Sequence, residues 1–483
     1  QAAGLLSLLT LAGVGFWLRG ARHLLARPSA PRPAAATLAP AFLLLPAALL
    51  TMKLAVIDRL PTPLRHTRLQ GDTLAGVQIP LRADFAGGVR VLGYDLSRAV
   101  LPSGQSADLS LYLGLSHPVG VRYWPTFALQ DADGLTWSAF DQPVPRWHRE
   151  PPYTQLWPPL PEGYAQWSRQ IDVLPGTPPG YYQLWATIFD HDSKIPDSLL
   201  DENDSPVAPR LLLGEIEITR PPPLLAAKLD GLQPLHALLS PSLTLLGYSV
   251  DRAEARPGDT VYLTLLWSAI SPPTGMRVQV TLGKTVWERD PVPGFPAEEW
   301  EAGDVWRAQL PLTLPAGQPG GEQDWQVGVP SNGIVGGSSV RLTGLRVAAI
   351  ERVFAPPPVE VALAVPVGDI ARLVGYTREQ NTITLLWQAV QETPISYAAF
   401  VHLVGADGRT VAQHDSLPAL YARPTASWLP GEFVLDPHPL QLPPDLPPGE
   451  YTLLAGLYDP RSGERLPTGR EDGRVALGVL QLR

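Results

Sequence analysis

The sequence predicts an all-β protein: three tandem antiparallel β-sandwich (Ig-like) domains that follow two N-terminal transmembrane helices. Three observations lead to this prediction. Two long apolar segments lie within the first 70 residues, a strand-rich segment recurs three times after them, and 55 of the 483 residues are proline. Proline breaks long helices and favours short strands joined by turns. The length also exceeds that of one ordinary domain.

The two apolar segments span residues 2–18 and 34–52. At about 1.5 Å per residue, a helix over the second segment is long enough to cross roughly 30 Å of hydrocarbon. Pro40 and Pro46 interrupt this segment, which membrane helices tolerate when neighbouring groups satisfy the freed carbonyls. We therefore expect residues 1–69 to form a membrane anchor. Two buried core helices are the alternative.

The charges around these segments predict the side of the membrane on which the chain lies. The connection between them carries Arg19, Arg22, Arg27 and Arg32 and no acidic residue. Short arginine-rich loops stay in the cytoplasm, so the bulk of the chain should lie on the extracytoplasmic side of the cytoplasmic membrane. The lipid bilayer is then a partner. The residues after 69 are mostly acidic, which makes nucleic acid a poor partner.

The start of the sequence differs from that of an ordinary secreted protein. No basic region or small-residue cleavage site accompanies the first apolar segment, as a secretory signal requires. The first residue is Gln1. We expect either the C-terminal part of a longer polytopic protein or a chain whose start is incompletely known.

A tripeptide marks the beginning of each repeat. It reads Leu-Gly-Tyr at residues 92–94 and 246–248, and Val-Gly-Tyr at 374–376. A strand with strict alternation of apolar and polar residues follows each copy, as expected for a sheet with one buried face. The alternating apolar positions are Leu109, Leu111, Leu113 and Leu115; Val261, Leu263, Leu265 and Trp267; and Ile383, Leu385 and Trp387.

Two further elements recur in the first and third repeats. Residues 127–134 resemble residues 400–408, and both segments end in Asp-Gly, a strong signal for a tight turn. Residues 178–186 resemble residues 447–455, in which Pro-Pro-Gly leads into a strand that ends in an aromatic residue and aspartate. Turn signals at this spacing favour a two-sheet antiparallel sandwich.

Triproline segments at 221–223 and 356–358 divide the repeats. We therefore expect β-sandwiches over residues 70–220, 224–355 and 359–483. Polyproline is stiff, so the linkers should hold the domains at defined spacings.

The third repeat resembles a module at the C-terminal end of certain bacterial membrane glycosyltransferases. The matching segments are residues 400–403, 407–408, 413–415, 428–432 and 446–466. These enzymes are the dolichyl-phosphate-mannose protein mannosyltransferase-like (GT-C type) proteins, which use lipid-linked sugars. The resemblance implies that the catalytic carboxylate lies in an early loop between membrane helices. The loop between the two predicted helices has no acidic residue, so no catalytic residue is carried over.

The sequence lacks the usual marks of an enzyme. Cysteine is absent, which excludes disulfides and thiolate chemistry. Motifs of dinucleotide-binding proteins, P-loop proteins, zinc proteases and serine hydrolases are absent too. No catalytic, cofactor-binding or metal-binding residue is therefore predicted.

Two clusters were considered as metal sites. His402 and His414, with Asp407 and Asp415 nearby, could form a metal or acid–base site; a polar strand edge and a turn are the simpler interpretation. The densest acidic segment, residues 190–204, supplies oxygen ligands of the type that Ca²⁺ prefers. It has no EF-hand spacing, and a solvated loop is the alternative.

An aromatic loop is the best candidate for an interaction site. Residues 144–161 are rich in proline and contain Trp147, Tyr153 and Trp157. Exposed aromatic side chains either stack on sugars or anchor a protein partner. Three interpretations stay open: the loop packs on its own sandwich, docks a protein partner of the envelope or membrane, or binds a glycan.

Three functions follow from these observations. The chain could be a membrane-anchored extracytoplasmic protein that acts as a cell-envelope spacer, binding or accessory module. It could instead be the C-terminal part of a polytopic glycosyltransferase whose catalytic helices lie upstream of Gln1. The third interpretation is a non-catalytic subunit of a larger membrane complex.

Overall fold

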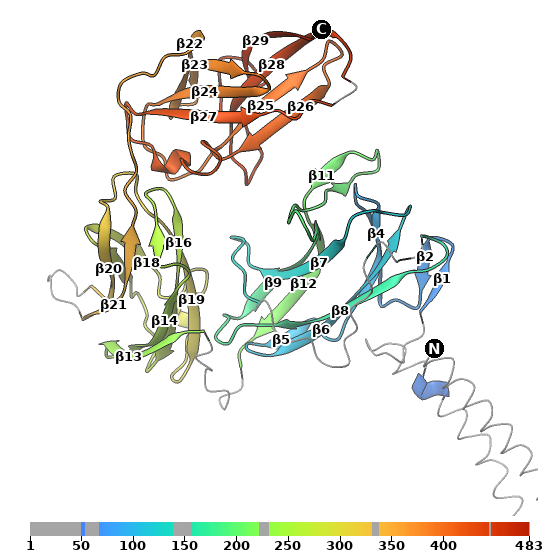
Figure 1. Cartoon of the computed structure of the whole chain (residues 1–483). Coiled ribbons are helices and arrows are strands. Elements are labelled where there is room, and N and C mark those ends of the chain that lie inside the picture. The colour runs from blue at the N-terminus through green and yellow to red at the C-terminus, as the bar shows by residue number, and fades with distance from the viewer. Residues whose placement is uncertain are drawn as a thin grey trace, which may run out of the picture. The chain divides into compact units, whose positions relative to one another are not determined.

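The computed structural model describes most of the chain beyond residue 66. The described residues are 50–53, 67–138, 154, 157, 159–221, 231–330, 338–443 and 446–482. Their regular elements are almost all β-strands, and most strand pairs are antiparallel, which confirms the all-β prediction (Figure 1). The chain divides into two compact units, residues 1–228 and 229–483.

The predicted membrane anchor lies almost wholly outside the described residues. Of residues 1–69, the structure describes residues 50–53, which are helical, and residues 67–69, of which Arg68 and Leu69 begin a strand. Within the described part of the chain, none of the helices has the length and apolar character needed to span a bilayer. The anchor over residues 1–69 stays a prediction.

The first unit contains one β-sandwich with two four-stranded sheets. One sheet has the order β3 (Ile79–Asp84), β4 (Val89–Leu96), β6 (Ser106–Leu115) and β8 (Ala165–Asp172). The other has the order β5 (Val100–Pro102), β12 (Leu211–Thr219), β9 (Gly180–Asp190) and β7 (Tyr123–Gln130). Two short ribbons flank them: β1 (Arg68–Gln70) with β2 (Thr73–Ala75), and β10 (Leu199–Leu200) with β11 (Pro206–Ala208).

The second unit contains two further pairs of sheets, here called the second and third sandwiches. In the second sandwich, one sheet has the order β13 (Gln233–Ser240), β14 (Leu243–Val250), β16 (Thr260–Ala269) and β19 (Val305–Thr313). The other sheet has the order β15 (Glu254–Ala255), β21 (Ser339–Val347), β20 (Gly321–Gly328), β17 (Val278–Leu282) and β18 (Thr285–Arg289). A 3₁₀ turn, η3 (Ala297–Glu299), precedes β19.

The third sandwich repeats this plan with four strands in each sheet. One sheet has the order β22 (Val361–Val367), β23 (Ala371–Glu379), β24 (Thr382–Ala389) and β27 (Phe433–Pro439). The other has the order β26 (Thr410–Ser416), β25 (Ala398–Val404), β28 (Gly449–Tyr458) and β29 (Val475–Leu482). The turn η4 (Thr425–Ser427) is the counterpart of η3. The sheets agree with three sandwiches, while the domain boundaries proposed from the sequence stay predictions.

The alternating strands place their apolar residues as predicted. Trp267 and Trp387 are both fully buried, each in the core of its own sandwich. The first sandwich departs from the prediction of one buried face, because Tyr112 on β6 is buried as well. The β1–β2 ribbon explains this: Leu74 on β2 and Leu92 form a small second cluster with Tyr112.

The tyrosine of the repeated tripeptide joins the two sheets of each sandwich. The Tyr94 hydroxyl donates to the carbonyl of Leu213 at 2.5 Å, and the Tyr376 hydroxyl donates to that of Leu477 at 3.2 Å. In the second sandwich the Tyr248 hydroxyl instead accepts a bond from the Thr343 amide at 3.1 Å. The preceding glycine allows a close strand approach, since a Cβ on Gly375 would lie 2.4 Å from the Val361 carbonyl oxygen.

The Pro-Gly turns share a second fixed bond. The Tyr182 hydroxyl donates to the Pro178 carbonyl at 2.8 Å, and the Tyr451 hydroxyl donates to the Pro447 carbonyl at 2.7 Å. This is the arrangement of the tyrosine corner in Ig-like sandwiches. In the divergent second repeat, Gln323 takes the place of tyrosine and donates its amide to the Pro319 carbonyl.

Candidate functional site

The aromatic loop is described only at Thr154, Trp157 and its last residues. Trp157 is 6% exposed and lies in the core of the first sandwich. Its backbone amide donates to the Thr154 carbonyl at 3.0 Å. The Trp157 side chain therefore packs on its own sandwich, while the interpretation of the other loop residues stays open. Trp147 and Tyr153 lie outside the described residues, and their role as interaction residues stays a prediction.

Trp157 has an equivalent in the third sandwich. The Trp428 amide donates to the Thr425 carbonyl at 3.1 Å, as the Trp157 amide does to Thr154. The Thr154 hydroxyl accepts from the Tyr123 amide at 2.9 Å and donates to the Val121 carbonyl at 2.8 Å. The Thr425 hydroxyl makes the same two bonds, to the Tyr397 amide and the Ile395 carbonyl. The Thr-x-x-Trp turn is thus part of the repeat.

The repetition of this turn was not recognised from the sequence. The pattern Pro-x-x-x-Trp-x-x-Gly-acid occurs at residues 296–304 and 424–432, but only the second copy was noticed, through the family resemblance. In both copies the final carboxylate accepts a backbone amide three residues earlier: Asp304 from Glu301 at 2.7 Å, and Glu432 from Leu429 at 3.0 Å. The shared spacing could have revealed it.

Glu432 is a fully buried carboxylate that two arginines neutralise. Arg352 lies 2.6 Å from one carboxylate oxygen and Arg423 lies 2.6 Å from the other. Both guanidiniums are largely shielded from water. Buried charges of this kind persist in proteins when they are paired and hydrogen-bonded.

Arg352 also connects the second and third sandwiches. It lies in the segment between them and donates to the Ser427 carbonyl at 3.0 Å and to the Ala316 carbonyl of the second sandwich at 2.6 Å. The backbones approach closely at this point, because a Cβ on Gly258 would lie 2.5 Å from the Ser427 amide nitrogen. We call Arg352, Arg423 and Glu432 the joint.

The histidines of the third sandwich do not form the site that the sequence suggested. In the β25–β26 pair, Val401 lies opposite His414 and His402 lies opposite Gln413. His402 and His414 therefore face opposite sides of the sheet. His402 lies 3.1 Å from Asp415, whereas Asp407 bonds the Arg409 amide in the hairpin turn. The structure separates these residues into a strand-edge pair and a turn.

His414 belongs instead to a buried polar chain. Its Nδ1 atom lies 3.0 Å from Nδ1 of His438, and Nε2 of His438 lies 3.0 Å from the carboxylate of Asp436. The Trp387 indole donates to the same carboxylate at 3.0 Å. Burial lowers the pKa of His414, and the neighbouring His438 lowers it further.

Asp436 also fixes an unusual turn. Its second oxygen accepts the Ala419 amide at 2.8 Å. Ala419, Leu420 and Tyr421 all have positive φ, at 55°, 53° and 72°. Three consecutive non-glycine residues in this region are costly for L-amino acids. The buried polar chain therefore stabilises a strained turn that carries the exposed side chains of Leu420 and Tyr421.

The acidic segment 190–204 uses its carboxylates to form turns. Asp190 accepts from the Asp192 amide and the Ser193 hydroxyl, and Asp201 accepts from the Asn203 and Ser205 amides. Asp197 accepts from the Gly87 amide at 2.9 Å, and burial raises its pKa. Within the described part of the chain, no group of three or more metal-ligating residues occurs. The weak calcium prediction gains no support from this arrangement.

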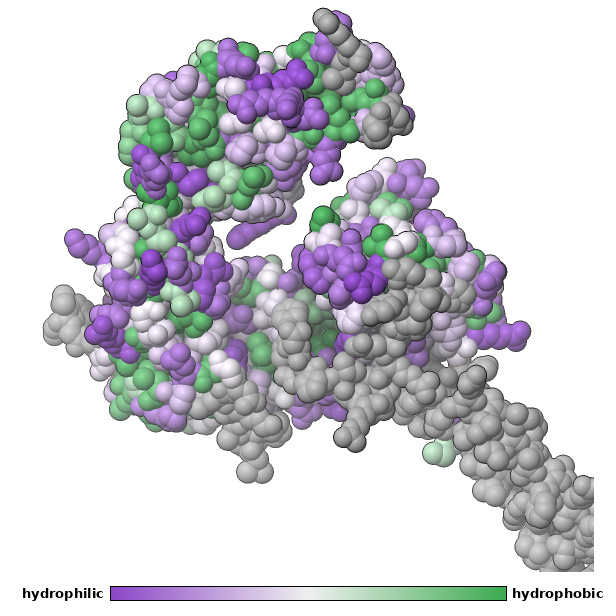
Figure 2. Space-filling view, viewed as in Figure 1, coloured by the Kyte–Doolittle hydropathy of each residue, from purple (hydrophilic) through white to green (hydrophobic). Residues whose placement is uncertain are grey.

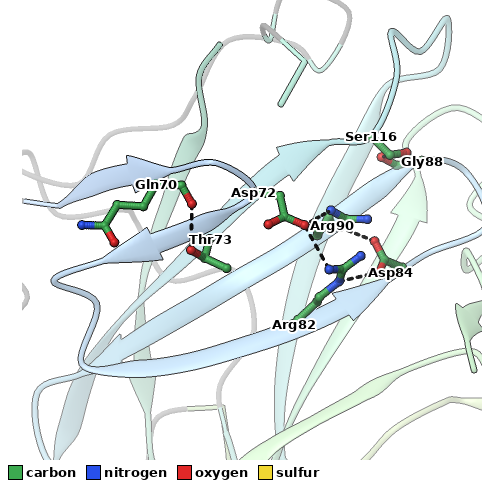
Figure 3. A network of polar contacts seen from close by, with 8 residues as sticks. All are labelled: Gln70, Asp72, Thr73, Arg82, Asp84, Gly88, Arg90 and Ser116. Atoms are coloured by element: carbon green, nitrogen blue, oxygen red, sulfur yellow. Dashed lines mark hydrogen bonds and ion pairs between the residues drawn. The ribbon is translucent and has the colours of Figure 1, made fainter. Parts of the chain in front are cut away.

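A charge network connects the first ribbon to its sandwich. Asp72, in the β1–β2 turn, lies 3.0 Å from Arg82 and 3.1 Å from Arg90 (Figure 3). Asp84 pairs with the same two arginines. Arg82 and Asp72 are largely exposed, so the network orients the ribbon more than it stabilises the fold.

Comparisons with known proteins assign no family. No family model matches the sequence, and no curated protein matches it. Among solved structures, dimeric latent PorU from Porphyromonas gingivalis covers 84% of this chain at 9% identity with a TM-score of 0.22, and the chain spans only 34% of its length. A marsupial T cell receptor covers 80% at 13% identity, matching 99% of that chain, with a TM-score of 0.15. The ICAM-5 D1–D4 ectodomain fragment covers 81% at 14% identity, matching 75% of that chain, also with a TM-score of 0.15. These TM-scores lie below 0.5, and the sheets of the chain itself establish its all-β fold.

Proposed function

We propose that this chain is a spacer and accessory module that its N-terminal segments hold at the outer side of a membrane. The joint carries this proposal. A buried carboxylate with two arginines gives Arg352 one favoured position, and Arg352 in turn bonds a backbone carbonyl of the second sandwich and one of the third. Such a connection suits a module that must hold its domains at a set spacing.

Polar groups elsewhere in the chain support the same role. Asp436 is buried and accepts the backbone amide of Ala419 in a turn, and the carboxylates of residues 190–204 close turns of their own. A spacer needs such groups for shape. An extracytoplasmic location and a membrane anchor remain part of the proposal and rest on the apolar segments of the sequence.

The distance between the second and third sandwiches tests the spacer role. The chain has no cysteine, so spin labels at Val286→Cys and Val479→Cys in the full chain report one distance. Both positions are exposed on strands. We expect a narrow distance distribution that broadens with Arg352→Ala. Arg346→Ala, which removes an exposed arginine of the second sandwich, is the control. A broad distribution in the parent protein contradicts a fixed spacer.

The glycosyltransferase tail is the second candidate function. Its support is the segment 428–432, which the family resemblance singled out and which contributes Glu432 to the joint. A tail of this kind would hold an acceptor or a partner near catalytic helices upstream. Sequencing the gene upstream of the codon for Gln1 tests it: many further hydrophobic segments support the tail, and a start codon close by contradicts it.

A further inference from the structure

One strand edge of the third sandwich differs from the other sheet edges. Exposed edges invite pairing with other chains, and proteins protect them with proline, charge or very short strands. In the described four- and five-stranded sheets, strands β3, β5, β7, β13, β19, β22 and β27 at the edges contain proline, and β8, β15, β18 and β26 contain a charged residue. Strand β29 has the sequence VALGVLQL and contains neither.

In the first two sandwiches, a short strand covers the same edge. Strand β5 pairs in parallel with the end of β12, and β15 pairs in parallel with the end of β21. Each inserts one buried apolar side chain, Leu101 in the first sandwich and Ala255 in the second. The incoming strand accepts a backbone bond from the last strand: the Glu217 amide donates to Ala99 at 2.8 Å, and the Arg346 amide donates to Ala253 at 3.0 Å.

The third sandwich has no such strand within its described residues. The segment that supplies β5 or β15 is replaced by a tight turn at Gln380 and Asn381, which joins β23 directly to β24. In the described part of the chain, β29 pairs with β28 alone. Its side chain Val479 is 64% exposed. The space-filling view shows apolar and polar residues mixed over the surface of the third sandwich (Figure 2).

The register of β28 and β29 shows which backbone amide of β29 points to the open edge. Val347 lies opposite Gly321 in the second sandwich, and Leu482 lies opposite Gly449 in the third. Gln481 is thus the counterpart of Arg346, whose amide bonds the incoming strand. In an antiparallel ladder, alternate residues direct their amides away from the neighbouring strand. The Gln481 amide therefore points to the open edge.

We propose that the open edge of β29 binds an extended segment of another polypeptide, which pairs in parallel at Gln481 and Leu482 as β5 and β15 do in the other sandwiches. The segment should direct one apolar side chain into the sandwich, as Leu101 and Ala255 do. Strand addition of this kind takes affinity from backbone bonds and specificity from the inward side chains.

A second copy of this chain is a poorer occupant. Its strands β5 and β15 are already paired within their own sandwiches. Its β29 is the long final strand of a sandwich, whereas the strands that cover this edge in the first two sandwiches, β5 and β15, are short and differ from β29 in sequence. The proposal does not depend on the spacer role.

A peptide copied from the chain provides the probe. A synthetic peptide of residues 97–105, which contains β5, is made with a photoreactive benzophenone residue in place of Leu101 and is irradiated with the full chain in detergent micelles. We expect cross-links to residues 475–482, identified by mass spectrometry. Absence of cross-links at peptide concentrations up to about 1 mM, the weak end of specific affinity, overturns the proposal. Cross-links that lie mainly on other strands overturn it too.

Two substitutions at one position separate binding from folding. Gln481→Pro removes the amide that should bond the peptide, and edge strands tolerate proline where the amide faces solvent. Gln481→Ala keeps the amide and is the matched control. We expect about a tenfold lower cross-linking yield for Gln481→Pro, equal yield for Gln481→Ala and equal melting temperatures for both. Equal yields in the two variants overturn the proposal. Sedimentation of the parent chain as a dimer that Gln481→Pro dissociates also overturns it, in favour of a second copy.

Discussion

The guanidinium of Arg352 lies 2.6 Å from the carboxylate of Glu432, although the two residues are 80 positions apart in the sequence. Glu432 is the residue directly before β27, whereas Arg352 precedes all strands of the third sandwich. The pair therefore joins the third sandwich to the segment that leads into it. Because Arg352 also bonds Ala316, the same residue transmits this constraint to the second sandwich.

Removing the charge of Glu432 should destabilise the protein strongly. Glu432→Gln leaves two shielded guanidiniums without their carboxylate, and breaking a buried pair costs about 3–5 kcal/mol. Urea unfolding, monitored by tryptophan fluorescence, measures this loss. Asp324→Asn, which removes an exposed partner of Arg341, should cost less than about 1 kcal/mol. Equal losses of unfolding free energy in the two variants would show that the joint stabilises the protein no more than an exposed ion pair does.

Trp157 should behave as a core residue. Trp157→Ala removes a buried ring from the first sandwich and should cost about 3–5 kcal/mol of unfolding free energy. Tyr181→Ala, at a position 71% exposed on β9, should cost less than about 0.5 kcal/mol. If Trp157→Ala leaves the melting temperature unchanged while it disrupts a copurifying assembly, Trp157 is an interaction residue after all.

The two threonines of the repeated turn should respond alike. Thr154→Val and Thr425→Val each remove a hydroxyl that bonds one amide and one carbonyl. Leaving a buried amide without an acceptor costs about 1–3 kcal/mol. Thr154→Ser and Thr425→Ser keep the hydroxyl and should recover most of the loss in urea unfolding. A large loss at one site and none at the other would mean that the two turns are not equivalent.

The pKa of His414 predicts a pH dependence of stability. Because burial lowers the pKa of His414 in the folded state, the unfolded state binds its proton more readily. Neutral His414 therefore makes its full contribution to the free energy of unfolding above the pKa of the unfolded state, about 6.5. This contribution is lost as the pH falls through the lower pKa of the folded state. Urea midpoints at several pH values between about 7.5 and 5, the range of histidine titration, should fall more steeply for the parent protein than for His414→Gln. Identical slopes would contradict this.

The sequence predicted the strands well and the contacts between distant segments poorly. The alternation at Val261, Leu263 and Leu265 was sufficient to predict a strand and its buried face, because the side chains of a strand point to alternating faces. The faces of His402 and His414 depended on the register of a hairpin with an extra residue in its turn, which the spacing alone does not give. The partner of Glu432 lies 80 residues away, and no local pattern marks Arg352.

The burial of Trp157 was not predicted, for a related reason. Trp157 follows a proline-rich segment without strand alternation, so no periodicity indicated its burial. Its position is set by the turn at Thr154, whose hydroxyl bonds the amide of Tyr123, 31 residues earlier. The equivalent spacing of Thr425 and Trp428 was present in the sequence and could have been found by comparing the repeats.

In the strained turn of the third sandwich, a substitution by glycine should stabilise the protein, although such substitutions usually destabilise. Leu420 has a φ of 53° and is 49% exposed, so its side chain contributes limited packing. A leucine in this conformation costs about 1–2 kcal/mol, whereas the added chain entropy of glycine costs about 0.5–1 kcal/mol. Leu420→Gly should therefore raise the free energy of unfolding by about 0.5 kcal/mol, measured by urea titration. Leu238→Gly, at a 61% exposed position of β13, should lower it instead. A loss of stability in both variants would show that Leu420 packs against its surroundings strongly enough to offset the strain of its backbone.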